Sequence, residues 1–321
     1  MATCHTRIVE RALTRLKLRQ LRLLVAVGKH GSIQNAARDL GVSQPAATKM
    51  IQDLEFDFEV KLFERTNRGV VPTVFGDTLI RHGKLIFTQV SNAAQELDDL
   101  SEGNSGRVVV GTLLAASPTL LPVAIEQVLK DRPKVAIKIV EGTNEVLMPA
   151  LLSGEIDMIV GRLPSHRHRA KIVQEKFFDE RILAVAGPQH PLAERAGVTF
   201  EELTSHGWIL PPVETTLRRQ TDQFFVLQGQ YVPTVAIESV SYLANRSLMR
   251  MHDFVGLMPA HVASLDIEKG LLARIDWEVP FGAGPVGVSH RGEQSLSPAG
   301  AAFRDALKQA VQDIQSSTVP A

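Results

Sequence analysis

Residues 31–54 read GSIQNAARDLGVSQPAATKMIQDL, which contains two short helical patterns with a glycine between them. Ser32 is suited to cap the first helix, a second helix starts at Ser43, and Gly41 supplies the backbone freedom that a tight turn needs. Small and apolar residues recur at helical spacing on one face of each pattern. The stretch therefore predicts two packed helices joined by a short turn.

The second helix presents a polar face away from its apolar residues. Gln can pair with adenine through two hydrogen bonds, Thr can contact a thymine methyl group, and Lys can contact guanine or phosphate. A helix-turn-helix whose second helix enters the major groove has this pattern, although any two-helix hairpin with a solvated polar face shares the periodicity. The candidate DNA-contacting residues of the stretch are Ser32, Gln44, Pro45, Thr48, Lys49 and Gln52.

The distribution of charge separates the N-terminal region from the rest of the chain. The 321 residues carry 35 Lys and Arg against 35 Asp and Glu, a net charge of zero. Residues 1–73 hold 12 of the basic residues and 7 of the acidic ones, a net charge of +5, so the remainder is acidic. Because affinity for phosphate depends on local charge, this partition favours an N-terminal module that contacts nucleic acid.

The segments that flank residues 31–54 extend this module. Residues 1–15 lack a clear cap and are interpreted as a tail, whereas residues 16–27 form an amphipathic helical pattern with Leu18, Leu21 and Leu24 or Val25 facing inward. Downstream, a turn between short β-prone pieces predicts a two-stranded wing. Such a wing could place Arg65 and Arg68 along the DNA backbone or in the minor groove, the alternative being a solvated hairpin.

A long helical pattern follows from residue 74 to about residue 100. Leu79, Ile86, Ala93 and Leu100 recur every seven residues, interleaved with Gly83, Val90 and Leu97. This spacing is typical of a two-helix coiled coil, although a single buried helix produces part of the same pattern. Dimerisation along the seam would present two recognition helices to an inverted repeat.

Beyond a linker at residues 102–106, β-branched runs alternate with amphipathic helical segments in two successive sets. Each set predicts an α/β lobe with a parallel, doubly wound sheet. We expect the chain to cross between the lobes near Leu163 and to return near Pro280, which leaves a cleft between them. The predicted domains are a tail (1–15), a DNA-binding domain (16–73), a linker and dimerisation helix (74–105) and a ligand-binding domain (106–316), in which lobe I comprises about 106–163 and 281–316 and lobe II about 164–280.

Ligand-binding residues are expected at the carboxyl ends of the strands. Free N–H groups and helix dipoles favour an anion there, and hydroxyl groups recur at these positions. Several of the hydroxyls are equally suited to be helix N-caps, and Arg218 could pair with a ligand carboxylate or be solvated. The candidate ligand-binding residues are Ala116, Ser117, Thr143, Thr215, Thr216, Arg218 and Ser239.

The residues required by several other function classes are missing from the sequence. It has no nucleophile elbow, phosphate-binding loop or zinc-protease motif, and His166 and His168 lie in a basic loop that would repel a metal ion. We therefore predict no catalytic residues, metal or cofactor. The single cysteine, Cys4, the short apolar runs and the lack of a signal-peptide core predict a cytoplasmic protein with no membrane partner.

The run SIQNAARDLGVSQPAATKMIQDLE, followed by LFER and GVVPTVFGDTLIRHG, resembles the winged helix-turn-helix of LysR-type transcriptional regulators. The two predicted lobes resemble periplasmic substrate-binding proteins and the effector domain of that family. The segment PPVETTLR is similar to LysR regulators of sugar or aromatic-acid catabolism. The chain departs from the family pattern at Glu59, where a glycine is usual after the recognition helix and where a left-handed backbone would be strained.

The resemblance implies a sequence-specific transcriptional regulator that binds promoter DNA as a homodimer or homotetramer. A small anionic or polar metabolite would bind between the lobes as co-inducer, with support from family position for Ser117, Thr143 and the Thr215 region. RNA polymerase is a further candidate partner. The alternative is a solute-binding protein of a transport system with a fused N-terminal helical module, which would explain the lobes and leave the basic module unexplained.

Overall fold

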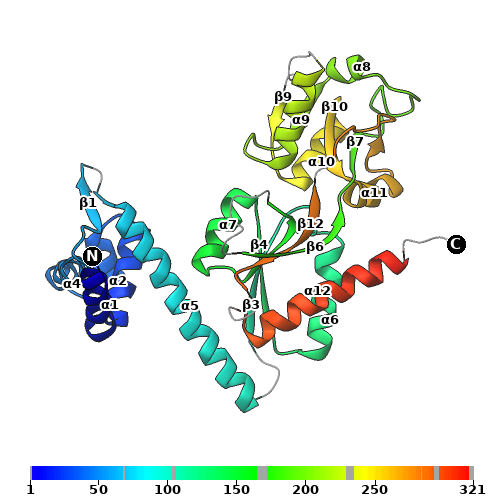
Figure 1. Cartoon of the computed structure of the whole chain (residues 1–321). Coiled ribbons are helices and arrows are strands. Elements are labelled where there is room, and N and C mark those ends of the chain that lie inside the picture. Colours follow the sequence, from blue (N-terminus) through cyan, green and yellow to red (C-terminus); the bar gives the residue numbers. More distant parts are fainter. Residues whose placement is uncertain are drawn as a thin grey trace. The chain divides into compact units, whose positions relative to one another are not determined.

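The computed structural model describes residues 2–67, 69–102, 106–164, 172–228, 235–282, 284–292 and 296–317. The chain divides into two compact units, Met1–Ser91 and Asn92–Ala321. Both are shown in Figure 1, and each is described by itself.

The N-terminal unit is a winged helix-turn-helix. Its elements are α1 (Ala2–Arg15), α2 (Leu18–His30), α3 (Ile33–Asp39), α4 (Gln44–Phe58), β1 (Phe63–Thr66), β2 (Gly69–Pro72) and the first part of α5 (Val74–Glu102). The predicted cap at Ser32 is confirmed, since its Oγ accepts a hydrogen bond from Asn35 N at 3.3 Å. Ser43, where the second helix was predicted to start, caps α4 through a hydrogen bond from Ala46 N to its Oγ at 3.4 Å. Gly41 has a φ of +65° in the turn between these helices.

A core of small and apolar side chains holds the helices of this unit together. Ala36, Ala47 and Leu54 are fully buried in it. Leu18, predicted to face inward, is 52% exposed, whereas Leu23 is fully buried. The reason is that α2 also packs against α5, so its buried face is broader than the single stripe that periodicity suggests.

Residues 1–15, predicted to be a tail, contain the helix α1. Arg11 Nη1 donates a hydrogen bond to Glu59 Oε1 at 2.7 Å, and Arg15 Nη1 lies 3.6 Å from Asp57 Oδ1. The partners of α1 thus lie at the end of α4, more than 40 residues away along the chain. Local sequence signals do not reveal a helix that is stabilised by such distant contacts.

Glu59 is the one described non-glycine residue with a positive φ, +56°. Left-handed backbone costs a residue with a Cβ about 1–2 kcal/mol, and the surface ion pair with Arg11 returns less than that. We therefore expect Glu59→Gly to raise the free energy of unfolding by roughly 0.5–1 kcal/mol, measured by urea denaturation. Glu59→Ala is the matched control, because it removes the ion pair and keeps the strain; a glycine variant less stable than the alanine variant would contradict the prediction.

The long helix α5 confirms the predicted helical pattern, and its seam is divided between two environments. A Cβ added at Gly83 would lie 3.3 Å from Val25 of α2, and Leu79 packs in the core of the N-terminal unit. Further along, Val90 is 51% exposed and Leu97 is 67% exposed. The first part of the seam therefore serves the core of this unit, and the later part is a surface.

The second unit consists of two α/β lobes. Lobe I has the sheet order β4-β3-β5-β12-β6 and lobe II the order β11-β7-β10-β8-β9. The elements of lobe I are β3 (Arg107–Thr112), α6 (Leu120–Asp131), β4 (Ala136–Glu141), α7 (Asn144–Ser153), β5 (Met158–Arg162), β6 (Val173–Asp179), β12 (Pro285–His290) and α12 (Pro298–Ser317). Those of lobe II are β7 (Ile182–Ala186), α8 (Phe200–Thr204), β8 (Gly207–Leu210), α9 (Thr216–Leu227), β9 (Val235–Glu238), α10 (Tyr242–Met251), β10 (Phe254–Pro259), α11 (Ala260–Glu268) and β11 (Ala273–Arg274).

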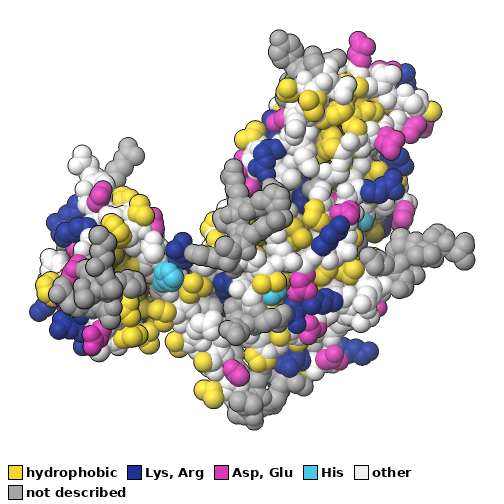
Figure 2. Space-filling view, in the orientation of Figure 1, with side chains coloured by type: hydrophobic (Ala, Val, Ile, Leu, Met, Phe, Trp, Pro, Cys, Tyr) yellow, Lys and Arg dark blue, Asp and Glu magenta, His cyan; other side chains and the backbone are white. Residues whose placement is uncertain are grey.

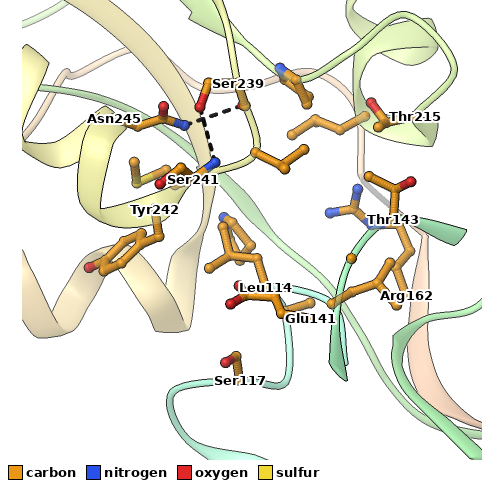
Figure 3. Close-up of a pocket in the computed structure, with 18 of the residues that line it drawn as sticks. Leu114, Ser117, Glu141, Thr143, Arg162, Thr215, Ser239, Ser241, Tyr242 and Asn245 are labelled. Atoms are coloured by element: carbon orange, nitrogen blue, oxygen red, sulfur yellow. Dashed lines mark hydrogen bonds between the residues drawn. The ribbon is translucent and has the colours of Figure 1, made fainter. Parts of the chain in front are cut away.

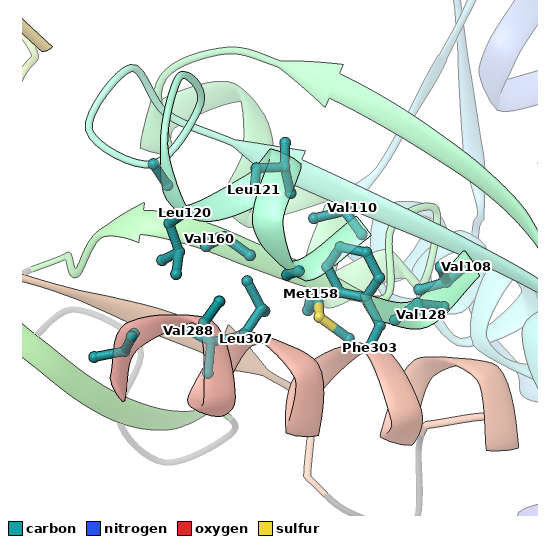
Figure 4. Close-up of a cluster of buried hydrophobic side chains, with 14 of the residues drawn as sticks. Val108, Val110, Leu120, Leu121, Val128, Met158, Val160, Val288, Phe303 and Leu307 are labelled. Atoms are coloured by element: carbon teal, nitrogen blue, oxygen red, sulfur yellow. The ribbon is translucent and has the colours of Figure 1, made fainter. Parts of the chain in front are cut away.

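Each lobe has its own apolar core. In lobe I, Phe303 and Leu307 of α12 pack together with Met158 and Val288 from the strands of the sheet, as Figure 4 shows. In lobe II, Trp208 of β8 and Phe225 of α9 are fully buried, with ring centroids 5.6 Å apart in an edge-to-face arrangement. The predicted two-lobed architecture is thus confirmed.

The sheets differ from the prediction in being mixed. Strands β4, β3 and β5 are parallel, as are β9, β8 and β10, but β12 and β7 each run antiparallel to the neighbouring parallel strand. The difference arises because β7 and β12 are the strands that follow the two crossings between the lobes. The short intervening segments bring the chain into each sheet from the opposite end.

The first crossing lies at Glu180 and Arg181 and not near Leu163, because β6 belongs to the sheet of lobe I, where it pairs with β12. Its residues alternate irregularly between exposed and half-buried, which suits an edge strand with one covered face. Glu175 and Lys176 lie within it, so the segment lacks the apolar run on which the sequence prediction of strands depended.

Candidate functional site

The helix α4 separates an apolar face from a polar one. Ala47, Ile51 and Leu54 are buried, while Gln44, Pro45, Lys49 and Gln52 are exposed and Thr48 is half-buried. Of the other candidates for DNA contact, Ser32 is half-buried at its cap, Arg65 is exposed on β1, and Arg68 lies outside the described residues. Figure 2 shows several Lys and Arg side chains on the face of this unit that it presents.

The wing is held against the helices by contacts that the sequence did not reveal. Glu55 Oε1 accepts a hydrogen bond from Leu62 N at 2.9 Å, and Glu55 Oε2 accepts one from Lys61 Nζ at 2.8 Å. Burial acts to raise the pKa of Glu55, but the hydrogen bonds from Lys61 and from the backbone outweigh it and hold the pKa below its ordinary value. At the other strand, Val70 N donates to Gly31 O at 2.8 Å. These bonds fix the wing, and with it Arg65, beside the helix-turn-helix.

A cavity of about 540 Å³ lies between the two lobes. Its walls come from the segments that follow the carboxyl ends of the parallel strands: β3, β4 and β5 in lobe I and β8, β9 and β10 in lobe II. Figure 3 shows Thr143 and Arg162 from lobe I and Thr215 and Ser239 from lobe II around this space. The volume is within the range of sites that bind small molecules, and the position is the one where open α/β sheets bind ligands.

Most of the predicted ligand-binding residues meet at this cavity. Ser117, Thr143, Thr215, Thr216 and Ser239 line it. Among the described residues, the hydroxyls of Ser117 and Thr143 make no hydrogen bond, since α6 starts later than predicted and Thr143 does not cap α7 through its side chain. Thr215 is a true cap, because its Oγ1 accepts from Arg218 N at 3.4 Å and donates to Pro212 O at 2.8 Å.

Two predicted ligand-binding residues do not line the cavity. Ala116 is fully buried in the core of lobe I. Arg218 is 8% exposed, and its guanidinium binds Asp222 Oδ1 at 2.8 Å and Glu238 Oε2 at 3.3 Å. The helical spacing of α9 therefore places the Arg218 guanidinium among carboxylates of its own lobe, where it supports the loop at Pro211, whose carbonyl oxygen it also contacts at 3.3 Å.

Sequence reasoning missed a second set of polar residues at the cavity, of which Glu141, Asn144, Arg162, Tyr242 and Asn245 are members. Asn245 Nδ2 donates to Ser239 O at 3.4 Å and Ser241 N donates to Ser239 Oγ at 3.0 Å (Figure 3). Tyr242 Oη donates to Asp266 at 2.5 Å, and burial together with this carboxylate raises the pKa of the phenol. Their common signal was position at the end of a strand or near the start of a helix, where hydroxyl groups and Arg218 had been considered.

Arg162 and Glu180 form a buried ion pair beside the crossing between the lobes. Arg162 Nε donates to Glu180 Oε2 at 3.0 Å, and Nη2 of the same guanidinium contacts the same oxygen. The side chain of Glu180 is fully buried and that of Arg162 is 12% exposed. The one arginine that lines the cavity in the described part of the chain is therefore already bound to a carboxylate.

The described residues contain no group of three or more His, Cys, Asp and Glu placed to hold a metal ion. In the same ranges, no helix combines the length and the apolar character needed to cross a membrane.

Comparison with known proteins assigns both units. The family model described as "Bacterial regulatory helix-turn-helix protein, lysR family" matches residues 18–77, and the model described as "LysR substrate binding domain" matches residues 101–312. The transcriptional regulator GbpR of Azospirillum brasilense is 33% identical over 298 residues, which are 92% of this chain and 87% of that protein. The regulator PcaQ of Agrobacterium fabrum is 29% identical over 300 residues, 94% of this chain and 96% of that protein.

Solved structures share the fold at lower identity. The crystal structure of CbnR, a LysR family transcriptional regulator, has a TM-score of 0.64 and 21% identity, covering 92% of this chain and 99% of CbnR. Full-length CbnR in complex with its target DNA also gives a TM-score of 0.64, with 22% identity and coverage of 92% of this chain and 100% of CbnR. ArgP of Mycobacterium tuberculosis gives 0.68 at 17% identity, covering 91% of this chain and 96% of ArgP.

Proposed function

The chain belongs to the LysR family of transcriptional regulators, and on this premise we propose that the polar face of α4 reads operator DNA and that the cavity between the lobes binds the effector. The proposal that α4 binds DNA rests on the two faces of this helix. The buried residues anchor the helix in its domain, and the exposed residues include side-chain types that bind base edges. Arg65 on the wing would contact the backbone beside them.

We further propose that the later part of α5 pairs two copies of the chain. Val90 and Leu97 are apolar, exposed and in the predicted heptad register, so a second α5 could bury them. A symmetric dimer of this kind would present two α4 helices to the half-sites of an inverted repeat, and pairs of dimers would give the homotetramer. Sedimentation at micromolar concentration should therefore show no monomer.

The cavity is proposed as the effector site because its walls come from both lobes. A ligand that contacts Thr143 of lobe I and Ser239 of lobe II would favour one arrangement of the lobes over others. Its effect on DNA binding is then a coupling free energy, of about 1–3 kcal/mol in typical cases. Promoter DNA, a small metabolite and a second copy of the chain are thus its partners, with RNA polymerase as a further candidate.

The decisive experiment follows thermal stability and the DNA footprint of the full chain while candidate metabolites are added. A compound that raises Tm is expected to change operator affinity or the length of the footprint. If every compound that raises Tm leaves both DNA measurements unchanged, the cavity is not an effector site. The solute-binding alternative is not favoured, since the relatives are transcriptional regulators. We propose that the protein acts in the cytoplasm, on DNA, without catalytic activity, metal or cofactor.

A further inference from the structure

This inference rests on the proposed effector cavity and concerns the chemical class of its ligand. We infer that the effector is an uncharged molecule with several hydroxyl groups, such as a monosaccharide or another polyol, in place of the anionic metabolite expected from the strand-end chemistry. Three features of the cavity wall support this: its charged side chains, its free hydroxyl groups and the state of the helix N-termini that face it.

The charged side chains disfavour an anion. Glu141, Glu145 and Arg162 are the charged residues that line the cavity in the described part of the chain. The guanidinium of Arg162 is bound to the fully buried Glu180, and separating them would leave a buried carboxylate without a partner. A ligand carboxylate would therefore meet two glutamates and one arginine whose charge is already balanced by Glu180.

The free hydroxyl groups of the wall suit a ligand that both donates and accepts hydrogen bonds. Ser117 and Thr143 line the cavity, and their hydroxyls make no hydrogen bond to another described residue. A ligand hydroxyl can donate to these groups as well as accept from them, whereas a carboxylate can only accept.

The helix N-termini explain why the ligand is neutral and not a cation. The helices α7, α9 and α10 all start at the cavity, and their positive ends disfavour a cationic group. Their attraction for an anion is reduced, because Glu145 lies in the first turn of α7 and because Thr215 and Ser241 each bind one N–H group at the start of α9 and α10. Ligand hydroxyl groups can both donate to and accept from the Ser and Thr hydroxyls of the wall.

The test compares sets of three compounds that share a skeleton and differ in charge: an aldose, its aldonic acid and its amino sugar, with benzyl alcohol, benzoate and benzylamine as an aromatic set. The full chain is titrated with each compound, and Tm and heat of binding are recorded. We expect at least one aldose of a panel of common hexoses and pentoses to raise Tm, and to bind at least tenfold more tightly than its acid and its amine.

Two variants relate this binding to the atoms that carry the inference. Thr143→Val removes a free hydroxyl of the wall with little change in shape and should weaken aldose binding about tenfold. Ser247→Ala, at an exposed position of α10 away from the cavity, is the matched control and should leave binding unchanged. Glu141→Gln, at an exposed position, should change aldose affinity less than threefold, whereas it would strengthen the binding of an anion.

The outcomes separate this inference from the proposed effector site. Ser239→Trp would fill the cavity and should abolish the rise in Tm. If the acids or amines bind more tightly than the aldoses and Ser239→Trp abolishes that binding, the ligand class is wrong and the site stands. If the rise in Tm survives Ser239→Trp, or if no compound of any set raises Tm, the effector site itself is wrong and the inference falls with it.

Discussion

Replacing Gln44 or Thr48 by alanine is expected to weaken binding to the specific operator by about 1–3 kcal/mol each, which is roughly fivefold to 150-fold, with little change in binding to unrelated duplex. Both side chains lie in the first turns of α4, beside its buried face, where Gln44 is exposed and Thr48 is half-buried. Neither makes a side-chain hydrogen bond to another described residue, so their removal should leave the stability of the fold unchanged. The decrease in operator affinity then measures only the lost contacts with base edges.

The measurement is a titration of labelled operator and of a scrambled duplex with each variant at several salt concentrations. Arg65→Ala is the control, because Arg65 is exposed and is proposed to contact the DNA backbone; it should weaken both complexes alike and reduce the salt dependence by about one phosphate contact. Equal losses on operator and scrambled duplex for Gln44→Ala and Thr48→Ala would show that these residues do not read bases.

Replacing Arg162 by leucine is expected to lower the free energy of unfolding by about 3–5 kcal/mol. The substitution leaves the carboxylate of Glu180 fully buried with its charge partner removed, at the point where the chain crosses between the lobes. One oxygen of Glu180, Oε1, already has no hydrogen-bond partner among the described residues, so little else is placed to compensate. The unpaired charge, and not the lost contact area, dominates the effect.

Urea denaturation of the full chain measures this effect, with two further variants beside it. The double variant Arg162→Leu/Glu180→Leu removes both charges and should recover most of the lost stability. A buried ion pair can often be replaced by apolar residues without a decrease in folding stability. Arg181→Leu is the neighbouring control; its side chain is exposed and should matter by less than about 0.5 kcal/mol. If the double variant is no more stable than Arg162→Leu, the buried carboxylate is not the cause.

The DNA-binding half could be predicted closely from the sequence. The caps at Ser32 and Ser43, the turn at Gly41 and the buried positions of α4 all depend on interactions within a few residues, so local patterns predict them. The sequence leaves the exit of α4 open, and the structure places Glu59 in the left-handed conformation at the position where the family pattern has a glycine. The helix α1 was missed because its ion pair with Glu59 joins residues 48 positions apart.

The candidate ligand site could be predicted in outline and not in detail. Strand ends were recognised, and Ser117, Thr143 and Ser239 do line one cavity. Arg218 was expected to face a ligand or solvent, but it is buried among carboxylates, and the arginine that lines the cavity is Arg162, which is bound to Glu180. Sequence spacing does not distinguish them, since each role depends on a partner from another segment.

The amino-acid sequence by itself determined the order of helices and strands, the polar face of α4 and the existence of two α/β lobes, because periodicity, caps and β-branched runs act over short distances. Only the tertiary structure decided which strands share a sheet, where the chain crosses at Glu180, and which polar groups in the cavity are already paired. Those properties depend on contacts between segments far apart in the chain. The charge that the cavity offers to a ligand depends on such contacts as well.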